Sequence, residues 1–294
     1  MNTTTFHDFF QGPALGFLMR AIDTALEEDG PDLTSLAVFG PAAPARAEIV
    51  AKQDAVAAGL PIGPLVLDAV TPGAGAGMRL CAADGQAVRP GQVVAEIHGP
   101  ASTLLRAERV ILNFLTHLSG IATLTRAYAD ALRGSRTTLL DTRKTLPGLR
   151  HVQKYAVLMG GGKNHRLSLG DMLMLKDNHI DQAGGIAPAV ARLRAAYRPC
   201  PPIEVECRTL GEVREAAALG VARIMLDNMA PGALAEALAL VPEGTQTEVS
   251  GGVSLDTLAA IAQAGPDFVS VGRLTHSAPA ADFSMRIHIP GRPQ

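Results

Sequence analysis

The chain has 294 residues, a formal net charge of −2, 18% charged residues and no tryptophan. It is long enough for one large domain or two ordinary ones, and its balanced charge excludes a global basic field that would attract nucleic acid or an anionic membrane. Three cysteines without CxxC spacing indicate reduced thiols, and apolar stretches are interrupted by glycine and proline, so we expect a cytoplasmic protein with no membrane span. The N-terminal segment has no basic residue before Arg20 and is not expected to be a signal peptide.

The first third of the chain contains two kinds of pattern. Residues 1–27 have apolar side chains at roughly helical spacing, which predicts a helical segment packing on the rest of the protein. Residues 28–100 contain short alternating segments separated by DG and PG turns, which predict strands. We expect a small N-terminal α/β sandwich domain over residues 28–117.

Helix and strand patterns alternate through the rest of the chain. Residues 101–133 have a broad apolar face and are expected to be helical. Beyond them, helical patterns such as 254–265, with an N-cap serine and a terminal glycine, separate short apolar runs. This alternation predicts a parallel sheet, and we expect a TIM-like β/α barrel, either closed or open and incomplete, over residues 118–285. The candidate strands are 137–143, 172–178, 202–208, 222–228, 246–252 and 267–273.

Each candidate strand ends in polar residues or glycine. In a parallel barrel the carboxyl ends of all strands open onto one face, where side chains from distant positions meet. We therefore expect a shared pocket at that face. The residues at the strand ends are Arg143-Lys144, Lys176-Asp177, Glu206, Asp227-Asn228, Ser250-Gly251-Gly252 and Gly272-Arg273.

Cations dominate the predicted pocket. Arg143 and Lys144 taken alone would suggest a solvated strand end, but Lys176 and the pair His165-Arg166 are expected at the same face. Such a pocket suits a small molecule with more than one acidic group, together with a phosphorylated compound.

Two acidic residues in so basic a pocket need an explanation. Glu206 and Asp227 end consecutive strands, and two carboxylates suit Mg²⁺, which completes its shell with waters and substrate phosphates. The alternative is an ion-pair network with Lys144 and Lys176.

Glycines at the last two strands suggest a phosphate site. Their main-chain N–H groups could face a phosphate, as is common after the final two strands of such barrels, although an SGG turn can also be an ordinary turn. The loop GGGKNH is not a Walker motif, because Val157 and Asn164 stand where glycine and serine or threonine are required. His117, His151, His179 and His276 are expected to be packing or hydrogen-bonding residues.

At these residues the chain resembles the quinolinate phosphoribosyltransferase family. The matching segments run in order from about residue 27 to residue 285. The motifs DTRKT, GGGKNHR and KDNH are highly specific for this family. The resemblance implies phosphoribosyl transfer from phosphoribosyl pyrophosphate to quinolinate with Mg²⁺, giving nicotinate mononucleotide, CO₂ and pyrophosphate in de novo NAD synthesis. The segments are EEDGPDLTS, AERVILNFLTHLSGIATLT, DTRKTLPGLR, KYAVLMGGGKNHRLSLGDMLMLKDNHI, IEVECRTL, IMLDNM, VSGGVSL and VGRLTHSAP.

The resemblance also implies a role for each site residue. Binding of the two quinolinate carboxylates is implied for Arg143, His165, Arg166 and Lys176, with Arg109 reaching the pocket from the partner subunit of a homodimer. Handling of the ribosyl pyrophosphate and its Mg²⁺ is implied for Lys144, Glu206 and Asp227. A cradle for the 5′-phosphate is implied for Ser250, Gly251, Gly252 and Gly272.

Two positions depart from the family pattern, and two rival functions exist. Val249 stands before SGG and Arg273 after VG, where the family usually has small residues. One rival is a paralogue of the same fold that is linked to molybdenum uptake. Such paralogues tend to lose the KDNH and GGGxNHR motifs, which this chain retains. The other is a non-catalytic anion-sensing barrel protein, for which pocket carboxylates would have no use.

Overall fold

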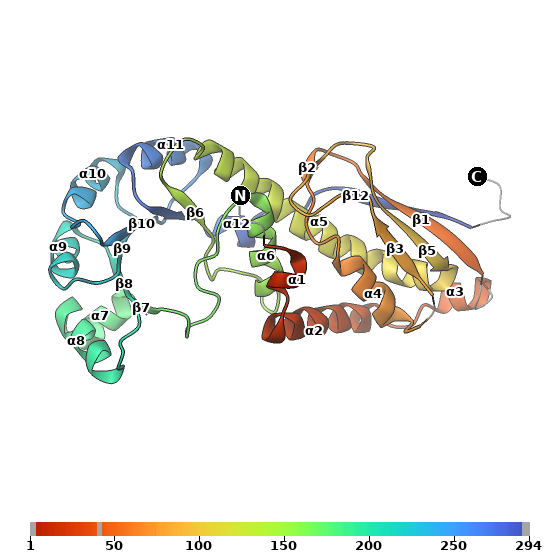
Figure 1. Ribbon diagram of the computed structural model, residues 1–294, viewed down its shortest axis with the longest axis horizontal. Coiled ribbons are helices and arrows are strands. Elements are labelled where there is room, and N and C mark those ends of the chain that lie inside the picture. Colours follow the sequence, from red (N-terminus) through yellow and green to blue (C-terminus); the bar gives the residue numbers. More distant parts are fainter. Residues whose placement is uncertain (1–3, 40–42, 74, 290–294) are drawn as a thin grey trace. The chain divides into compact units, whose positions relative to one another are not determined.

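The computed structural model describes residues 4–39, 43–73 and 75–289. These fall into two compact units, each with its own sheet (Figure 1). Unit 1 comprises residues 1–126, 145–161 and 273–294, and unit 2 comprises 127–144 and 162–272. The domain limits expected from the sequence stay a prediction.

Unit 1 contains a four-stranded antiparallel sheet in the order β12-β1-β5-β3. On β1, Ala45, Ala47 and Ile49 are buried and alternate with more exposed residues, which is the pattern of a sheet with one face on a core. The strands are β1 (Pro44–Ala51), β3 (Gly77–Leu80), β5 (Val93–Pro100) and β12 (Phe283–His288), and a separate pair consists of β2 (Ala55–Val56) and β4 (Ala87–Val88).

Helices supply the rest of the unit 1 core. The long helix α5 (Ala101–Ala131), which continues into unit 2, buries Leu104, Ile111 and Leu115 along one face. The helix expected over residues 1–27 is two helices, because Gly12 has φ 49° and Pro13 follows it. The others are α1 (Phe6–Phe9), α2 (Gly12–Asp29), α3 (Leu33–Val38), α4 (Ile62–Val70), α6 (Arg150–Gly160) and α12 (Arg273–His276).

Unit 2 is built on six parallel strands in the order β6-β11-β10-β9-β8-β7. Helices cover the outer face of the curved sheet in Figure 1. The predicted α/β fold, with a small N-terminal sheet domain and a C-terminal parallel β/α barrel, is confirmed. The strands are β6 (Thr138–Leu140), β7 (Leu173–Leu175), β8 (Ile203–Cys207), β9 (Arg223–Asp227), β10 (Gln246–Ser250) and β11 (Phe268–Ser270); the helices are α7 (Asp177–Ala183), α8 (Ile186–Ala196), α9 (Leu210–Ala218), α10 (Pro231–Ala239) and α11 (Leu255–Ala264).

The barrel is open between β6 and β7, which do not pair within the described residues. Beside β6, Lys163 forms an isolated parallel bridge with Leu140. Its N–H donates to the carbonyl of Leu139, and its carbonyl accepts from the N–H of Asp141. The GGGKNHR segment thus extends the sheet by a single residue and then leaves it, which accounts for the gap.

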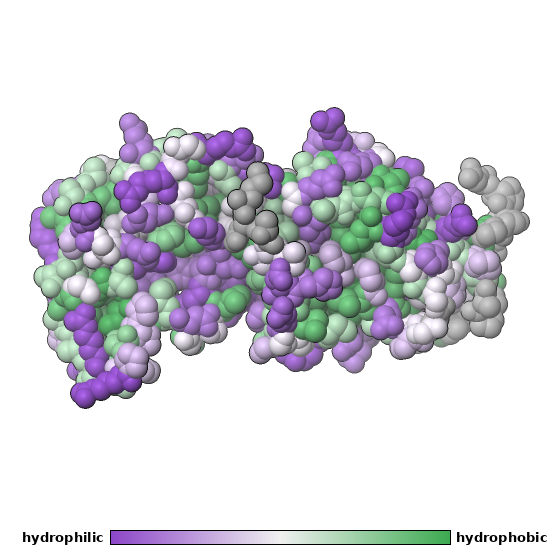
Figure 2. Space-filling view, in the orientation of Figure 1, coloured by the Kyte–Doolittle hydropathy of each residue, from purple (hydrophilic) through white to green (hydrophobic). Residues whose placement is uncertain are grey.

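The two faces of this sheet differ in chemistry. Side chains alternate along a strand, so Val205 and Val249 point to the buried helix side, whereas Glu206 and Ser250 line a cavity on the other face. Hydrophilic and hydrophobic residues are interspersed on the molecular surface in view in Figure 2. Among the described helices, none combines the length and the hydropathy that a membrane crossing needs.

Candidate active site

A cavity of about 300 Å³ lies at the carboxyl ends of the unit 2 strands. It brings together eight of the predicted site residues, which come from strand ends and loops spread over more than 100 positions of the chain. Those lining residues are Arg143, Lys144, His165, Arg166, Lys176, Glu206, Asp227 and Ser250. The convergence expected from the strand pattern is therefore observed.

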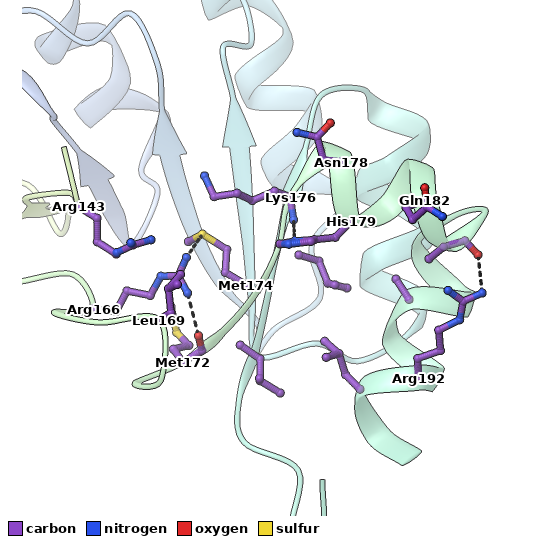
Figure 3. A pocket seen from close by; sticks show the side chains of 15 residues that line it. Arg143, Arg166, Leu169, Met172, Met174, Lys176, Asn178, His179, Gln182 and Arg192 are labelled. Carbon is purple, nitrogen blue, oxygen red and sulfur yellow. Dashed lines mark hydrogen bonds between the residues drawn. The ribbon is translucent and has the colours of Figure 1, made fainter. Parts of the chain in front are cut away.

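Two arginines meet in this cavity. The buried Nε–H of Arg143 has no acceptor among the described residues. Burial, and then the neighbouring charge of Arg143, lower the pKa of the Arg166 guanidinium. Figure 3 shows both guanidinium groups facing the same space, toward which the Lys176 ammonium also extends. An unpaired buried donor beside crowded positive charges indicates a place for an anion.

The orientation of the Arg166 side chain is set by contacts with β7 and with the residue that precedes it. One terminal nitrogen donates to the carbonyl oxygen of Met172 at 3.1 Å, and the other lies 3.4 Å from the sulfur of Met174 (Figure 3). These contacts hold the planar guanidinium in one orientation, which suits two-point recognition of a carboxylate.

A second cavity, of about 640 Å³, adjoins the first and shares Arg143, Arg166 and Lys176 with it. Its other lining residues are largely apolar, among them Met172 and Leu193, and they come from β7, the loop before it, α7 and α8. The cationic edge therefore borders a space that can accept the flat apolar body of a ring acid.

The KDNH segment forms the beginning of α7. Lys176 is the N-cap residue, and its main-chain N–H donates to Nδ1 of His179 at 3.1 Å. This local contact fixes the turn that carries the Lys176 side chain toward the cavity. His179 thus has the hydrogen-bonding role expected for it.

Glu206 and Asp227 lie on the adjacent strands β8 and β9 and face the same cavity. Burial raises the pKa of Glu206; the Lys176 ammonium, 3.6 Å away, lowers it, and the charge of Asp227 raises it again. Two carboxylates that repel each other across a cavity fit a hard divalent cation such as Mg²⁺, so the donor set is suitable. One pair of the alternative ion-pair network, Lys176–Glu206, is also present.

The SGG turn after β10 has a backbone that favours glycine. Gly251 has φ 87° and Gly252 has φ 62°, both in the left-handed region. A Cβ atom at Gly251 would overlap the side-chain amide of Asn228, whose Nδ2 donates to Asp227 at 2.9 Å. The turn is therefore packed directly against the residue that follows β9.

A cluster of buried charged residues lies beneath the strand-end residues that form the rim of the cavity. Nε2 of His165 is 3.2 Å from a carboxylate oxygen of Glu204 and 3.5 Å from one of Glu248, and all three residues are buried. Arg223, from the start of β9, pairs with Glu248 at 2.9 Å. The main-chain N–H of Arg166 donates to Nδ1 of His165 at 2.8 Å, so the imidazole N–H is on Nε2.

The hydrogen bond from the Arg166 N–H to Nδ1 of His165 also indicates whether this cluster holds a metal ion or a proton. His165, Glu204 and Glu248 place three possible ligand atoms within 4.8 Å of one another. A histidine that binds a metal through Nε2 carries its proton on Nδ1, where the Arg166 N–H already donates. The geometry therefore favours a proton between Nε2 and the carboxylates.

Four predicted site residues do not line the cavity: Gly251, Gly252, Gly272 and Arg109. Gly251 and Gly252 follow β10, and Gly272 follows β11. Arg109 is exposed on α5 in unit 1. Of the two departures from the family pattern, Val249 is buried on the helix side of β10, and Arg273 is exposed at the start of α12.

Sequence reasoning missed Glu204, Glu248 and Asp141, all fully buried in unit 2. A signal existed for the two glutamates, because Glu204 is two positions before Glu206, and Glu248 is two before Ser250. Residues two apart on a strand share a face. Asp141 had no comparable signal, since its partners lie more than 20 positions away.

An open parallel β/α barrel with a cationic pocket at its carboxyl end defines a class of enzymes that act on small anions. The N-terminal domain model of quinolinate phosphoribosyl transferase matches residues 32–119, and the C-terminal domain model matches residues 121–286. The chain belongs to the quinolinate phosphoribosyltransferase family, a class of pentosyltransferases.

Individual relatives agree with this assignment. A probable nicotinate-nucleotide pyrophosphorylase (carboxylating) from Bacillus subtilis is 43% identical over 266 residues, which cover 89% of this chain and 90% of the relative. The crystal structure of NadC from Streptococcus pyogenes is 40% identical with a TM-score of 0.87, covering 92% of this chain and 96% of that one. The nicotinate-nucleotide pyrophosphorylase from Francisella tularensis is 33% identical with a TM-score of 0.89, covering 95% and 99%.

Proposed function

We propose that this chain transfers the phosphoribosyl group of phosphoribosyl pyrophosphate to quinolinate with loss of CO₂. The products are nicotinate mononucleotide and pyrophosphate, on the de novo route to NAD. The names of the relatives support this reaction. The observation that carries it is the meeting of Arg143, Arg166 and Lys176 in one cavity, where the buried Nε–H of Arg143 finds no acceptor in the part of the chain that the structure describes.

Quinolinate occupies the cationic half of the cavity in this proposal. Its two carboxylates are held by Arg143, Arg166 and Lys176, and its ring lies toward the apolar space beyond β7. His165 contributes to the wall beneath them, because its ring nitrogens face the Arg166 N–H and the two buried glutamates. Pairing with a dianion relieves the repulsion between the two guanidinium groups.

Phosphoribosyl pyrophosphate occupies the other half. The SGG turn and Gly272 offer main-chain N–H groups to the 5′-phosphate, with Ser250 beside them. Lys144 neutralises the pyrophosphate. Glu206 and Asp227 would hold Mg²⁺, which when bound supplies positive charge to the departing pyrophosphate.

Ribosyl transfer follows from this arrangement. The cations fix the ring acid so that its nitrogen faces the anomeric carbon, and that nitrogen forms the new bond as the bond to pyrophosphate breaks. Positive charge develops on the ribose, and the carboxylates of Glu206 and Asp227 stabilise it electrostatically.

Decarboxylation completes the reaction. The transfer makes the ring nitrogen positively charged, and this charge stabilises the electron pair left on the adjacent carbon when its bond to the carboxylate breaks and CO₂ leaves. A proton then adds to that carbon. The chemistry needs no electron-sink cofactor, because the substrate ring acts as the sink.

Two active sites shared across a homodimer are part of the proposal. Arg109 belongs to unit 1 and is exposed on α5, whereas the cavity described above is built wholly from unit 2. Arg109 of one subunit would add a further cation to the quinolinate half of the other subunit's cavity.

Turnover tests the proposal. The purified protein is incubated with quinolinate, phosphoribosyl pyrophosphate and Mg²⁺, and nicotinate mononucleotide and CO₂ are measured. Both products are expected in equal amounts. Tight binding of quinolinate without turnover would favour the anion-sensing protein instead, and neither binding nor turnover would favour the molybdenum-linked paralogue.

A further inference from the structure

The buried carboxylate of Asp141 joins two segments of the site. Oδ1 accepts a hydrogen bond from the main-chain N–H of His165 at 2.8 Å, and Oδ2 accepts one from the side-chain amide of Asn164 at 2.7 Å. Asp141 follows β6 directly and is fully buried. Both oxygens of this side chain are therefore used to hold a loop that lies more than 20 positions away.

The two joined segments carry the two arginines of the cavity. Arg143 comes two residues after Asp141, and Arg166 comes directly after His165. The segment before His165 is also tied to β6, through main-chain hydrogen bonds between Lys163 and the strand. Asp141 completes this attachment at the point where the chain leaves the sheet and begins the substrate-facing loop.

Only a carboxylate suits both donors at once. An amide at position 141 would keep one acceptor oxygen but would turn an NH₂ group toward one of the two donors. A buried donor that loses its acceptor is costly, so the loop would move to restore a hydrogen bond. That movement would change the spacing between Arg143 and Arg166.

We propose that Asp141 is a positioning residue that sets the spacing of Arg143 and Arg166 for a dicarboxylate. The inference rests on the proposed function and adds to it a reason why the pocket fits two carboxylates on one ring. Asp141 itself does not line the cavity. It acts through the main chain of His165 and the side chain of Asn164.

An exchange of donor and acceptor tests this role. Asp141→Asn alone should raise the KM for quinolinate about 10- to 100-fold, in line with loss of one buried hydrogen bond, and leave the KM for phosphoribosyl pyrophosphate within about threefold. Adding Asn164→Asp restores a complementary pair, because the new amide then donates to the new carboxylate. The double variant should recover most of the quinolinate KM.

A second carboxylate of unit 2 provides the control. Asp267 also accepts from a main-chain N–H, that of Thr247 at 2.9 Å, but at the amino-terminal end of β10. Asp267→Asn should lower the melting temperature without changing the KM for quinolinate. A merely structural Asp141 would behave in the same way.

The outcomes separate the inference from the proposed function. A wild type that makes no product overturns the proposed function, whereas an active wild type with an unchanged quinolinate KM in a folded Asp141→Asn variant overturns the role of Asp141. A folded double variant as poor as the single one does the same. Amide exchange at His165 is independent of turnover: it should speed up in Asp141→Asn and slow again in the double variant, and equal exchange in all three proteins would overturn the inference.

Discussion

The ammonium group of Lys176, which follows β7, lies 3.6 Å from the carboxylate of Glu206 on the paired strand β8. In the proposed function, Lys176 belongs to the half of the cavity that binds quinolinate, and Glu206 belongs to the half that binds the ribosyl group. Occupancy of either half therefore changes the electrostatic environment of the other.

The pH dependence of turnover should reflect Glu206. Burial and the charge of Asp227 raise the pKa of this carboxyl group, against the lowering effect of Lys176. In the proposed mechanism the ionised form binds Mg²⁺ and stabilises the ribosyl cation. The ratio kcat/KM for phosphoribosyl pyrophosphate, which reports the free enzyme, should therefore fall with decreasing pH at a midpoint above about 4.3, the ordinary value for glutamate. Glu206→Gln should lower kcat by about 100- to 1000-fold and remove this limb. The measurement is a profile of kcat/KM from pH 4.5 to 8, with each sample reassayed at pH 7. A profile that stays flat down to pH 4.5 would contradict the prediction.

Arg143 should contribute strongly to quinolinate binding. Arg143→Ala is expected to weaken the affinity by about 2 to 5 kcal/mol, because a buried substrate carboxylate loses its partner. Arg143→Lys should recover only part of this, since a lysine cannot supply two parallel donors. Calorimetric titration with quinolinate measures both variants, and affinity for phosphoribosyl pyrophosphate serves as the control. Unchanged quinolinate affinity in Arg143→Ala would remove this residue from the site.

Arg109 should act across the subunit interface of the proposed dimer. Arg109→Ala and Glu206→Ala are each expected to be inactive, but a mixture that exchanges subunits forms some sites with both residues intact. With equal amounts and random exchange, about a quarter of the sites should recover. Activity after mixing is compared with that of each variant mixed with itself. A mixture that stays inactive despite demonstrated exchange would mean that Arg109 acts elsewhere.

The buried cluster should make stability depend on pH. Burial alone would lower the pKa of His165, but its hydrogen bonds with Glu204 and Glu248 raise it to about 9. The Arg166 N–H on Nδ1 opposes a fully protonated ring, so the extra proton is shared with the carboxylates, and burial raises the pKa of Glu204 as well.

The sign of the effect follows from the raised pKa. The folded state holds this proton more tightly than the unfolded state, so the stabilisation is complete below about pH 6.5 and is lost as the pH rises through about 9. The free energy of unfolding should fall by up to about 1.4 kcal/mol per pH unit within this range. Urea unfolding from pH 6 to 9.5 measures it. His165→Gln should flatten the slope, and equal slopes in both proteins would refute the assignment.

Neighbouring glycines allow a matched comparison at the proposed phosphate site. Gly252→Ala meets no described atom within 4 Å and should cost about 1 kcal/mol of stability from its positive φ. Gly251→Ala must also displace Asn228 and with it the contact to Asp227. It should therefore raise the KM for phosphoribosyl pyrophosphate more than Gly252→Ala does. Equal effects of the two substitutions would show that Asn228 is not coupled to the site.

The rim of the site was predictable because strand ends can be located from short apolar runs. The polar residue that ends each run, such as Lys176 or Asp227, then falls on a known face of a parallel sheet. The order of the strands around the barrel and the gap beside β6 were not predictable, because they depend on pairings between distant segments. The bridge formed by Lys163 is one such pairing.

The buried residues beneath the cavity, Glu204 and Asp141, were harder to predict than the residues at its rim. Glu204 lies inside an apolar run, where sequence reasoning treats a polar residue as an exception, although its two-residue spacing from Glu206 indicates a shared face. Nothing in the sequence near Asp141 indicates that its carboxylate binds the main chain of His165. Recognition by main-chain atoms leaves no residue-type signal.

The pairing of β12 with β1 has a consequence for how the protein is made. The last described strand forms one edge of the unit 1 sheet, beside a strand that begins at residue 44. During translation β1 is synthesised more than 230 residues before β12, so its hydrogen-bonding edge on that side stays open until residues 283–288 have been made. A chain that stalls between residues 271 and 282 would expose that edge to pairing with other chains, although all six barrel strands would already have been made.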